Sequence, residues 1–411
     1  MLNFDEILRK SVEEGASDIH LKVGLAPIIR KGGQLTPLAS VEDTCEMDNM
    51  KEIFFAVTTA HQRALFEKYR ELDLSYGVPG LGRFRLSLFQ QRGTLSMVIR
   101  HLSHRIPPFE ELKLPPTIKK IAELERGLVL VTGVTGSGKS TTLASMIEHI
   151  NQTQAKHILT IEDPIEFVMK DRKSIITQRE LGSDTHSFAS ALRAGLRQDP
   201  DVIMMGELRD QDSILTALVA AETGHLVLCT LHTGDCTETV SRLVSHFPAD
   251  QQMQVRHQLA SCLKAVVCQR LAMGSEEGQR LPAVEILLNT PRVKEMIIDP
   301  SRTKHILDAI EEGHDHYGTQ SFDQALLELL TTKQISFAEA LRLSTSPENF
   351  ALRAKGIASS ESKHWESFDH SSTLKENTST SAATKIELAL ELEKVETPKK
   401  DEISKKFRKA S

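Results

Sequence analysis

One segment of the sequence has the residue types and the spacing of a phosphate-binding loop. Residues 133–140 read GVTGSGKS, which matches the GxxxxGK[ST] pattern at every required position. An apolar run precedes the loop and a helical pattern follows it, as in nucleotide-binding proteins. Lys139 is expected to reach the β- and γ-phosphates of ATP, and Ser140 to bind Mg²⁺. The residues expected to contact the nucleotide here are Gly133, Val134, Thr135, Gly136, Ser137, Gly138, Lys139, Ser140 and Thr141.

A second candidate is the segment 201–207, DVIMMGE, an apolar run that ends in a carboxylate. This shape is typical of a Walker B strand, and Glu207 is the candidate general base that polarises the attacking water. Gly206 stands where many such NTPases have the Asp that binds Mg²⁺, so another acid is expected near the metal. Arg209, beside the base, is the one arginine in this part of the chain that is placed to neutralise the γ-phosphate.

Acidic residues follow another apolar run, at 161–166 (IEDPIE). The carboxyl ends of parallel strands share one ligand-binding edge of a sheet, so Glu162, Asp163 and Glu166 are expected to face the phosphates and the ion. Asp163 is the candidate metal ligand among them. The alternative is that these three acids only form a solvated loop.

Two histidines bracket the apolar run 226–231. His225 precedes it and His232 follows it, and either could sense the γ-phosphate or contact a neighbouring subunit. Taken alone, each would more often be a hydrogen-bonded structural histidine.

The elements that position these residues divide into parts. Residues 1–105 predict a small α/β domain with a helix at 4–12, a strand at 19–23, a hairpin around Gly32 and Gly33, and strands at 83–90 and 95–100. Prolines restrict the backbone of a linker over 106–126. Residues 127–355 predict an ATPase domain with buried parallel strands at 128–132, 157–161, 202–205 and 226–231, and helical segments elsewhere. The Ser/Thr-rich segment 356–411 has too little apolar surface to fold and predicts a disordered tail with a basic end.

Composition excludes several classes of protein. The 411 residues carry a net charge of −6, so nucleic acid is not an expected partner. Apolar runs are too short to span a bilayer, and the acidic N-terminus lacks the basic region of a signal peptide, so a cytoplasmic protein is expected. The five cysteines lack zinc-site spacing and are expected to be isolated reduced thiols.

Four blocks occur in a fixed order: GVTGSGKSTTLASMI, ILTIEDPIEF, DPDVIMMGELRD and AAETGHLVLCTLHT. This order resembles the secretion-ATPase superfamily, with its Walker A, Asp-box, atypical Walker B and His-box motifs. Within it, GASDIHLKVGLAPIIR, GLGRFRLSLFQQRG and ITQRELGSDTHSF resemble the type IV pilus retraction ATPases of the PilT and PilU type. The resemblance runs from about residue 3 to about residue 350 and leaves out the tail.

The resemblance implies a PAS-like N-terminal domain followed by a RecA-like ATPase domain, assembled into a homo-hexamer that binds ATP and Mg²⁺. It implies a place at the cytoplasmic face of the inner membrane, against a platform protein and with no membrane segment of its own, where hydrolysis drives pilus retraction. By motif position Glu207 is catalytic, Glu162 and Glu166 belong to the Asp box, and His225 and His232 belong to the His box. The N-terminal arginines that the family directs toward the phosphates match Arg83, Arg85 and Arg100.

The sequence departs from the retraction ATPases in one motif. The AIRNLIRE segment of PilT is replaced here by residues 290–298, TPRVKEMII, and the segments 320–326 and 335–341 favour the PilU type, which could share a ring with a paralogous retraction ATPase. Alternatives are a pilus-assembly or type II secretion ATPase, a P-loop phosphotransferase, and an accessory ring subunit that binds nucleotide only for assembly. The assembly and secretion ATPases usually have a further N-terminal domain, and intact Lys139 and Glu207 argue against the accessory subunit.

Overall fold

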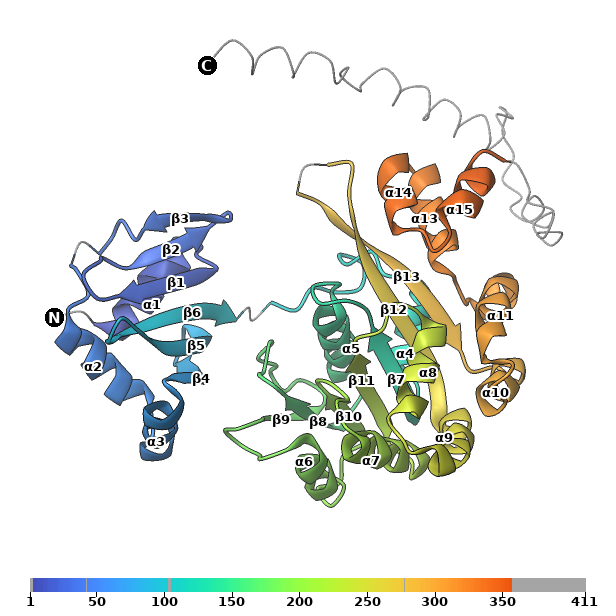
Figure 1. Ribbon diagram of the computed structural model, residues 1–411, viewed down its shortest axis with the longest axis horizontal. Helices are drawn as coiled ribbons and strands as arrows, with labels where there is room; N and C mark the ends of the chain where they lie inside the picture. Colours follow the sequence, from blue (N-terminus) through green and yellow to red (C-terminus); the bar gives the residue numbers. More distant parts are fainter. Residues whose placement is uncertain (1–2, 42, 103–104, 277, 357–411) are drawn as a thin grey trace, which may run out of the picture. The chain divides into compact units, whose positions relative to one another are not determined.

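The computed structural model describes residues 3–41, 43–102, 105–276 and 278–356 (Figure 1). The chain forms two compact units, one of Met1–Pro107 with Ile150–Gly206 and the other of Pro108–His149 with the residues from Glu207 onward. Except for Gly356, the tail predicted over 356–411 lies outside the described residues. The domain boundaries at 105 and 126 remain a prediction.

The first unit contains a six-stranded antiparallel sheet in the order β3-β2-β1-β6-β5-β4. Alternate side chains of its strands pack with helix α1 into one core that includes Ile7, Leu8, Leu21 and Phe84. The predicted helix at 4–12, the hairpin and the two later strands are confirmed. The elements are α1 (Phe4–Glu13), β1 (Asp18–Lys22), β2 (Ile28–Lys31), β3 (Gln34–Pro37), α2 (Met47–Val57), α3 (Ala60–Tyr69), β4 (Glu71–Val78), β5 (Gly82–Gln91) and β6 (Thr94–Leu102).

Three parallel strands complete the first unit. β8 (His157–Glu162) lies between β9 (Ile175–Glu180) and β10 (Val202–Met205), and helix α6 (Phe188–Gly195) contacts β8. β10 is buried along its whole length and β8 almost so, which confirms both predicted strands. Strand β9 was not predicted.

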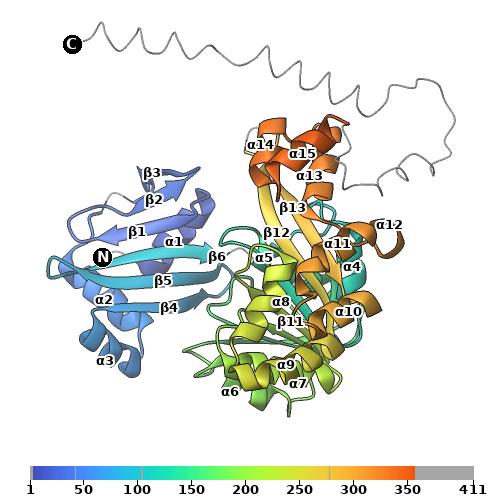
Figure 2. The same cartoon turned by 45° about the vertical axis from the view of Figure 1, so that its right-hand side comes forward.

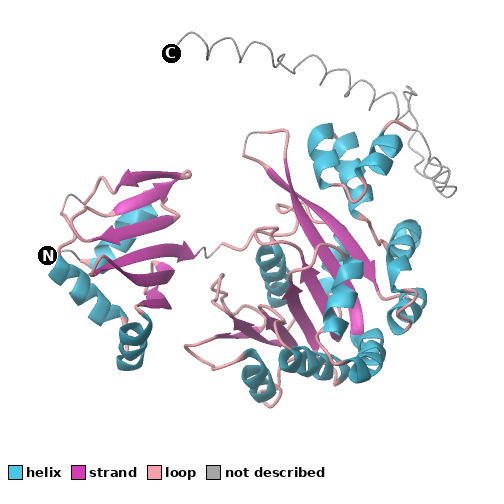
Figure 3. Ribbon diagram, in the orientation of Figure 1, coloured by secondary structure: helices cyan, strands magenta, loops and turns pink. Residues whose placement is uncertain are grey.

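In the second unit, β7 (Gly127–Thr132) lies between β11 (Leu226–Leu231) and β12 (Leu263–Met273), parallel to both. β13 (Arg280–Leu288) pairs antiparallel with β12, and the two strands form the long hairpin seen in Figure 3. The expectation that helices fill the chain outside the four predicted strands is therefore wrong at β9, β12 and β13.

Helices surround these strands. The loop after β7 leads into α5 (Lys139–Thr153), and helices α13 and α14 pack against the β12–β13 hairpin (Figure 2). The bounds of α13, α14 and the remaining helices are α4 (Pro116–Ala122), α7 (Gln211–Glu222), α8 (Cys236–Ser245), α9 (Ala249–Cys262), α10 (Pro291–Ile298), η1 (Thr303–His305), α11 (Ile306–Glu312), α12 (His314–Tyr317), α13 (Phe322–Thr331), α14 (Phe337–Leu343) and α15 (Pro347–Ala354). Among the described residues, no helix has the length and apolar character needed to cross a membrane.

The five cysteines are all free thiols, and all are buried. Burial raises the pKa of Cys45, and it raises the pKa values of Cys262 and Cys268 to about 12. Within the described parts of the chain, His, Cys, Asp and Glu side chains do not gather in groups of three or more that could hold a metal ion.

Candidate functional site

The phosphate-binding loop begins directly where β7 ends. Gly133 has a φ of +141°, and a Cβ there would lie 2.5 Å from both the carbonyl oxygen of Gln269 and the hydroxyl of Ser137. Only glycine fits this position. Gly138, which opens helix α5, has a φ of +93°, again in the region that glycine adopts without strain. The loop therefore has the backbone freedom that its sequence motif predicts.

Lys139 lies inside this loop with 8% of its surface exposed. Its Nζ donates hydrogen bonds to the carbonyl oxygens of Gly133 (2.9 Å) and Val134 (3.0 Å). The hydroxyl of Ser137 is buried and makes no hydrogen bond within the described residues. An ammonium group held against the loop and a buried hydroxyl without a partner are groups that phosphate oxygens would satisfy, so these residues fit a nucleotide.

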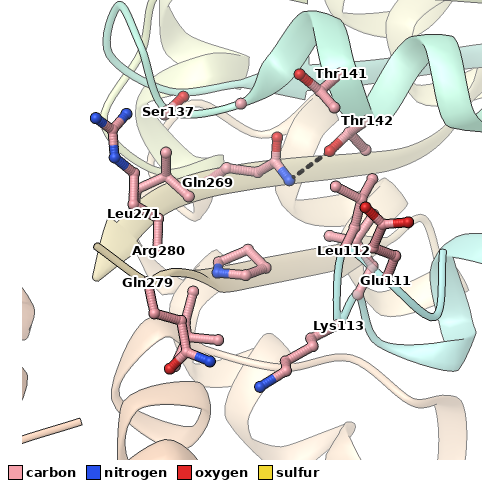
Figure 4. A pocket seen from close by; sticks show the side chains of 14 residues that line it. Glu111, Leu112, Lys113, Ser137, Thr141, Thr142, Gln269, Leu271, Gln279 and Arg280 are labelled. Carbon is pink, nitrogen blue, oxygen red and sulfur yellow. Dashed lines mark hydrogen bonds between the residues drawn. The ribbon is translucent and has the colours of Figure 1, made fainter. Parts of the chain in front are cut away.

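A cavity of about 280 Å³ opens beside the loop, entirely within the second unit (Figure 4). Gln269 of β12 donates from Nε2 to Thr142 Oγ1 (2.8 Å), while its Oε1 is buried and has no partner in the described structure. The lining side chains drawn in Figure 4 include Leu112, Leu271 and Arg280. The sequence analysis missed this cavity because most of its wall comes from residues 111–114 and from the β12–β13 hairpin, which carry no motif.

Glu207 follows β10 and is held by two side chains that the sequence analysis also singled out. Arg209 Nε donates to its Oε2 at 2.7 Å, and His232 Nε2 lies 3.4 Å from its Oε1. The backbone N–H of Leu208 donates to the carbonyl of Thr230 in β11 (3.1 Å), which fixes the segment. The side chain of Glu207 is 22% exposed. The structure thus brings the candidate base, Arg209 and His232 into one cluster.

Glu162 ends β8 and is 6% exposed. Its Oε1 accepts hydrogen bonds from Thr160 Oγ1 (2.7 Å) and Gln178 Nε2 (3.1 Å). Burial raises the pKa of this carboxyl, although these hydrogen bonds oppose the shift. Asp163 and Glu166, in contrast, are exposed. A Cβ added at Gly206 would lie 3.5 Å from the Cα of Glu162, so an Asp-box acid does lie beside the place where the Walker B aspartate is missing.

Strand β9 holds the Asp-box loop through residues that the sequence analysis did not identify. Gln178 binds Glu162, donates to the carbonyl of Phe167 (2.9 Å) and accepts from the N–H of Met169 (2.8 Å). Two positions further on, Glu180 accepts from the N–H of Ile165 (3.2 Å). The sequence of this strand has several polar residues and resembles that of a loop. Its role is therefore visible only from its contacts in the folded structure.

The structure corrects the expectation for His225. β11 runs parallel to β7, and His225 precedes the start of β11 while the phosphate loop follows the end of β7. A strand of this length separates its ends by about 17 Å at ~3.3 Å per residue. His225 Nδ1 donates to the carbonyl of Ala220 (2.9 Å) at the end of α7. This histidine therefore does not contact the nucleotide of its own chain, and a contact with a neighbouring subunit remains a prediction.

The three N-terminal arginines each contact a carboxylate. Arg83 Nη2 lies 2.9 Å from Glu180, Arg85 Nη2 3.5 Å from Asp73, and Arg100 Nε 2.8 Å from Asp18. Their approach to the phosphates remains a prediction, and it requires these ion pairs to open.

A buried acid supports the loop that follows His232. Glu285 of β13 is 1% exposed, and its Oε1 accepts a hydrogen bond from the N–H of Cys236 (2.8 Å), the first residue of α8. Burial raises the pKa of this carboxyl to about 7.

This pKa predicts how stability depends on pH. Below the unfolded value of 4.5 the carboxyl is protonated in both states. As the pH rises from there to about 7, the folded state keeps a proton that the unfolded state releases, so the free energy of unfolding should fall, by about 3 kcal/mol at most. Glu285→Gln should remove this part of the slope in denaturant titrations at about pH 5 and about pH 8. The exposed Glu328→Gln is the control, and an unchanged slope in Glu285→Gln would refute the assignment.

Comparison with known proteins shows the family to which the chain belongs. A family model described as "Type II/IV secretion system protein" matches residues 83–324. The chain is 41% identical over 354 residues to the type IV pilus retraction ATPase PilT of Pseudomonas aeruginosa, which covers 85% of this chain and 100% of PilT. It is 39% identical over 363 residues to the type IV pilus ATPase PilU of the same organism, covering 88% of this chain and 94% of PilU.

A solved structure is similar as well. The crystal structure of the pilus retraction motor PilT with bound ADP has a TM-score of 0.77 and 42% sequence identity, covering 85% of this chain and 99% of that one. The predicted α/β fold class is confirmed by this match.

Proposed function

Because the chain belongs to the type II/IV secretion system protein family of P-loop ATPases, we propose that it is the ATP-driven motor of type IV pilus retraction. The observation that carries this proposal is its similarity over the whole length of PilT. By contrast, the match to the type II secretion system protein E of Xanthomonas campestris covers only 30% of that protein, so the secretion alternative has less support.

The site residues suit this reaction in the following roles. Lys139 and the loop around it bind the β- and γ-phosphates, and the cavity beside Gln269 accepts the adenine, whose amino group matches the partnerless Oε1. Glu207 accepts a proton from the attacking water, and its bonds to Arg209 and His232 hold the carboxylate in one orientation.

The hydroxyl of Ser140 and the carboxylate of Asp163 are hard oxygen donors of the kind that Mg²⁺ prefers. When bound, Mg²⁺ would neutralise charge on the phosphates. Glu162 and Glu166 complete the acidic loop, whose shape Gln178 maintains. We propose these acids as the substitute for the aspartate that Gly206 replaces.

The proposed assembly is a homo-hexamer that can also include a paralogous retraction ATPase and that acts on an inner-membrane platform protein. It would work at the cytoplasmic face of that membrane. Two measurements test the function. The purified chain should release phosphate from ATP, and expression in a bacterium deleted for its own retraction ATPases should restore twitching motility. Phosphate release without any restored motility would favour an assembly or secretion role.

Hydrolysis is expected to require the ring. Arg83, Arg85 and Arg100 are proposed to bring positive charge to the phosphates as subunits close, so specific activity should fall when the protein is diluted below its assembly constant. At least one of the three Arg→Ala variants should lose turnover by about tenfold or more while still binding ATP. Phosphate release measured over a dilution series, beside sizing chromatography with and without ATP, provides the check. Concentration-independent activity with three fully active variants would show that each chain carries a complete site.

A further inference from the structure

Glu180 is a buried acid that the reaction described above does not use. It ends strand β9 and is 3% exposed. Four groups donate to its carboxylate: Ser75 Oγ (2.8 Å), Arg83 Nη2 (2.9 Å), the N–H of Ile165 (3.2 Å) and Ser183 Oγ (3.4 Å). A carboxylate so far removed from water is stable only while such partners remain.

Three of these partners, Ser75, Arg83 and Ile165, come from two different places. Ser75 and Arg83 belong to β4 and β5 of the six-stranded sheet, whereas Ile165 lies in the loop that carries Glu162, Asp163 and Glu166. Both places belong to the first compact unit. One oxygen, Oε2, accepts from Ser75, Arg83 and Ile165. A shift of either place therefore changes the hydrogen bonding of the other.

We propose that Glu180 is a positioning residue that ties the Asp-box loop to strands β4 and β5, so that the position of the six-stranded sheet sets the position of the catalytic acids. The inference rests on the proposed ATPase function. Gln178 holds the far side of the same loop at Phe167 and Met169, and the hydrogen bonds described for its side chain go to this loop and to Glu162. Glu180 accepts hydrogen bonds from both this loop and the six-stranded sheet.

The guanidinium of Arg83 also explains how the tie could open. Within the described residues, only its Nη2 is bonded, while its Nε is buried without a hydrogen-bond partner. If Arg83 turns to a nucleotide phosphate, Glu180 loses the one cationic partner that it has among the described residues. The buried carboxylate must then rearrange, and the loop at Ile165 moves with it.

Hydrogen exchange at single amides tests this directly on the full chain. In Glu180→Ala, the amide of Ile165 should exchange at least about tenfold faster, because its acceptor is gone. The amide of Met169, bonded to Gln178, should keep its protection. Acceleration of both amides would indicate a general loss of stability and would overturn the proposal. Glu180→Gln retains an acceptor for Ile165 and should leave its exchange near that of the wild type; it also serves if the alanine variant fails to fold.

The coupling has its own readout. Arg83→Gln should accelerate exchange at Ile165, because both residues donate to Oε2 of Glu180, and this effect should vanish in the Glu180→Gln background. If Arg83→Gln left the exchange rate of the Ile165 amide unchanged, the proposed link to the six-stranded sheet would be overturned. The exposed ion pair of Arg292 and Glu312 supplies the control, Glu312→Gln, in which the exchange rate of the Ile165 amide should not change.

Turnover measurements test whether the position of the loop affects catalysis. Glu180→Ala should lower kcat by about 10- to 100-fold and change the KM for ATP by less than about threefold, because the acids are misplaced while the phosphate loop is intact. Faster exchange at Ile165 with unchanged kcat would refute a positioning role. If the wild-type chain released no phosphate, the proposed function would fail, and the exchange measurements would still decide whether Glu180 holds the loop.

Discussion

Lys139→Ala should abolish detectable nucleotide binding. The variant removes the side-chain cation of the loop, which we propose contacts the β- and γ-phosphates, and with it charge-assisted hydrogen bonds that contribute about 1.5–3 kcal/mol each. Loss of two such bonds weakens binding by at least about 100-fold. Removing the ammonium also removes the hydrogen bonds that it donates to the carbonyls of Gly133 and Val134, so the loop itself loses order.

Calorimetric titration with ATP measures this change. Lys304→Ala is a matched control because Lys304 is exposed and lies in the same compact unit. It should bind ATP as the wild type does. Tight binding of ATP by Lys139→Ala would show that the nucleotide site lies elsewhere in the chain.

Glu207→Gln should separate binding from chemistry. Glutamine has the same shape and can still accept a hydrogen bond from Arg209, so ATP should bind within about threefold of the wild-type affinity. The neutral amide cannot accept the proton of the attacking water, and turnover should fall by about 100- to 10,000-fold.

Single-turnover phosphate release, with binding measured on the same preparation, distinguishes the two effects. The exposed Glu222→Gln should behave like the wild type in both measurements. If Glu207→Gln turned over ATP at the wild-type rate, another acid would be the general base. Glu162, beside Gly206, would be the first to test.

The elements that could be predicted from the sequence are those that a single local pattern determines. Strands β7, β10 and β11 are mostly apolar and are buried throughout, so their composition alone identifies them. The phosphate loop was predictable for a related reason, since its conformation depends on glycines at fixed positions. Glu207 followed from its place at the end of such a strand.

The elements that were missed depend on partners distant in sequence. β12 contains Gln269 and Arg270, which break an apolar pattern; in the fold Gln269 bonds Thr142, and Arg270 donates to the carbonyl of Leu343 and lies over the ring of Phe322. Glu180, at the end of β9, likewise has a partner that is distant in sequence, because its carboxylate accepts a hydrogen bond from Arg83. The expectation for His225 failed for a different reason. The motif identified the residue, but it did not show that β11 runs parallel to β7, which places His225 and the phosphate loop at opposite ends of these strands.

The buried thiols have a practical consequence for following this protein at work. The thiolate is the form that reacts with maleimides, and burial together with raised pKa values keeps Cys45, Cys262 and Cys268 from forming it near neutral pH. Cysteines introduced at the exposed positions Leu35 and Tyr317, one in each compact unit, would therefore be labelled selectively. A donor and acceptor dye at these two sites would report changes in the distance between the units during ATP turnover, with every native cysteine left in place.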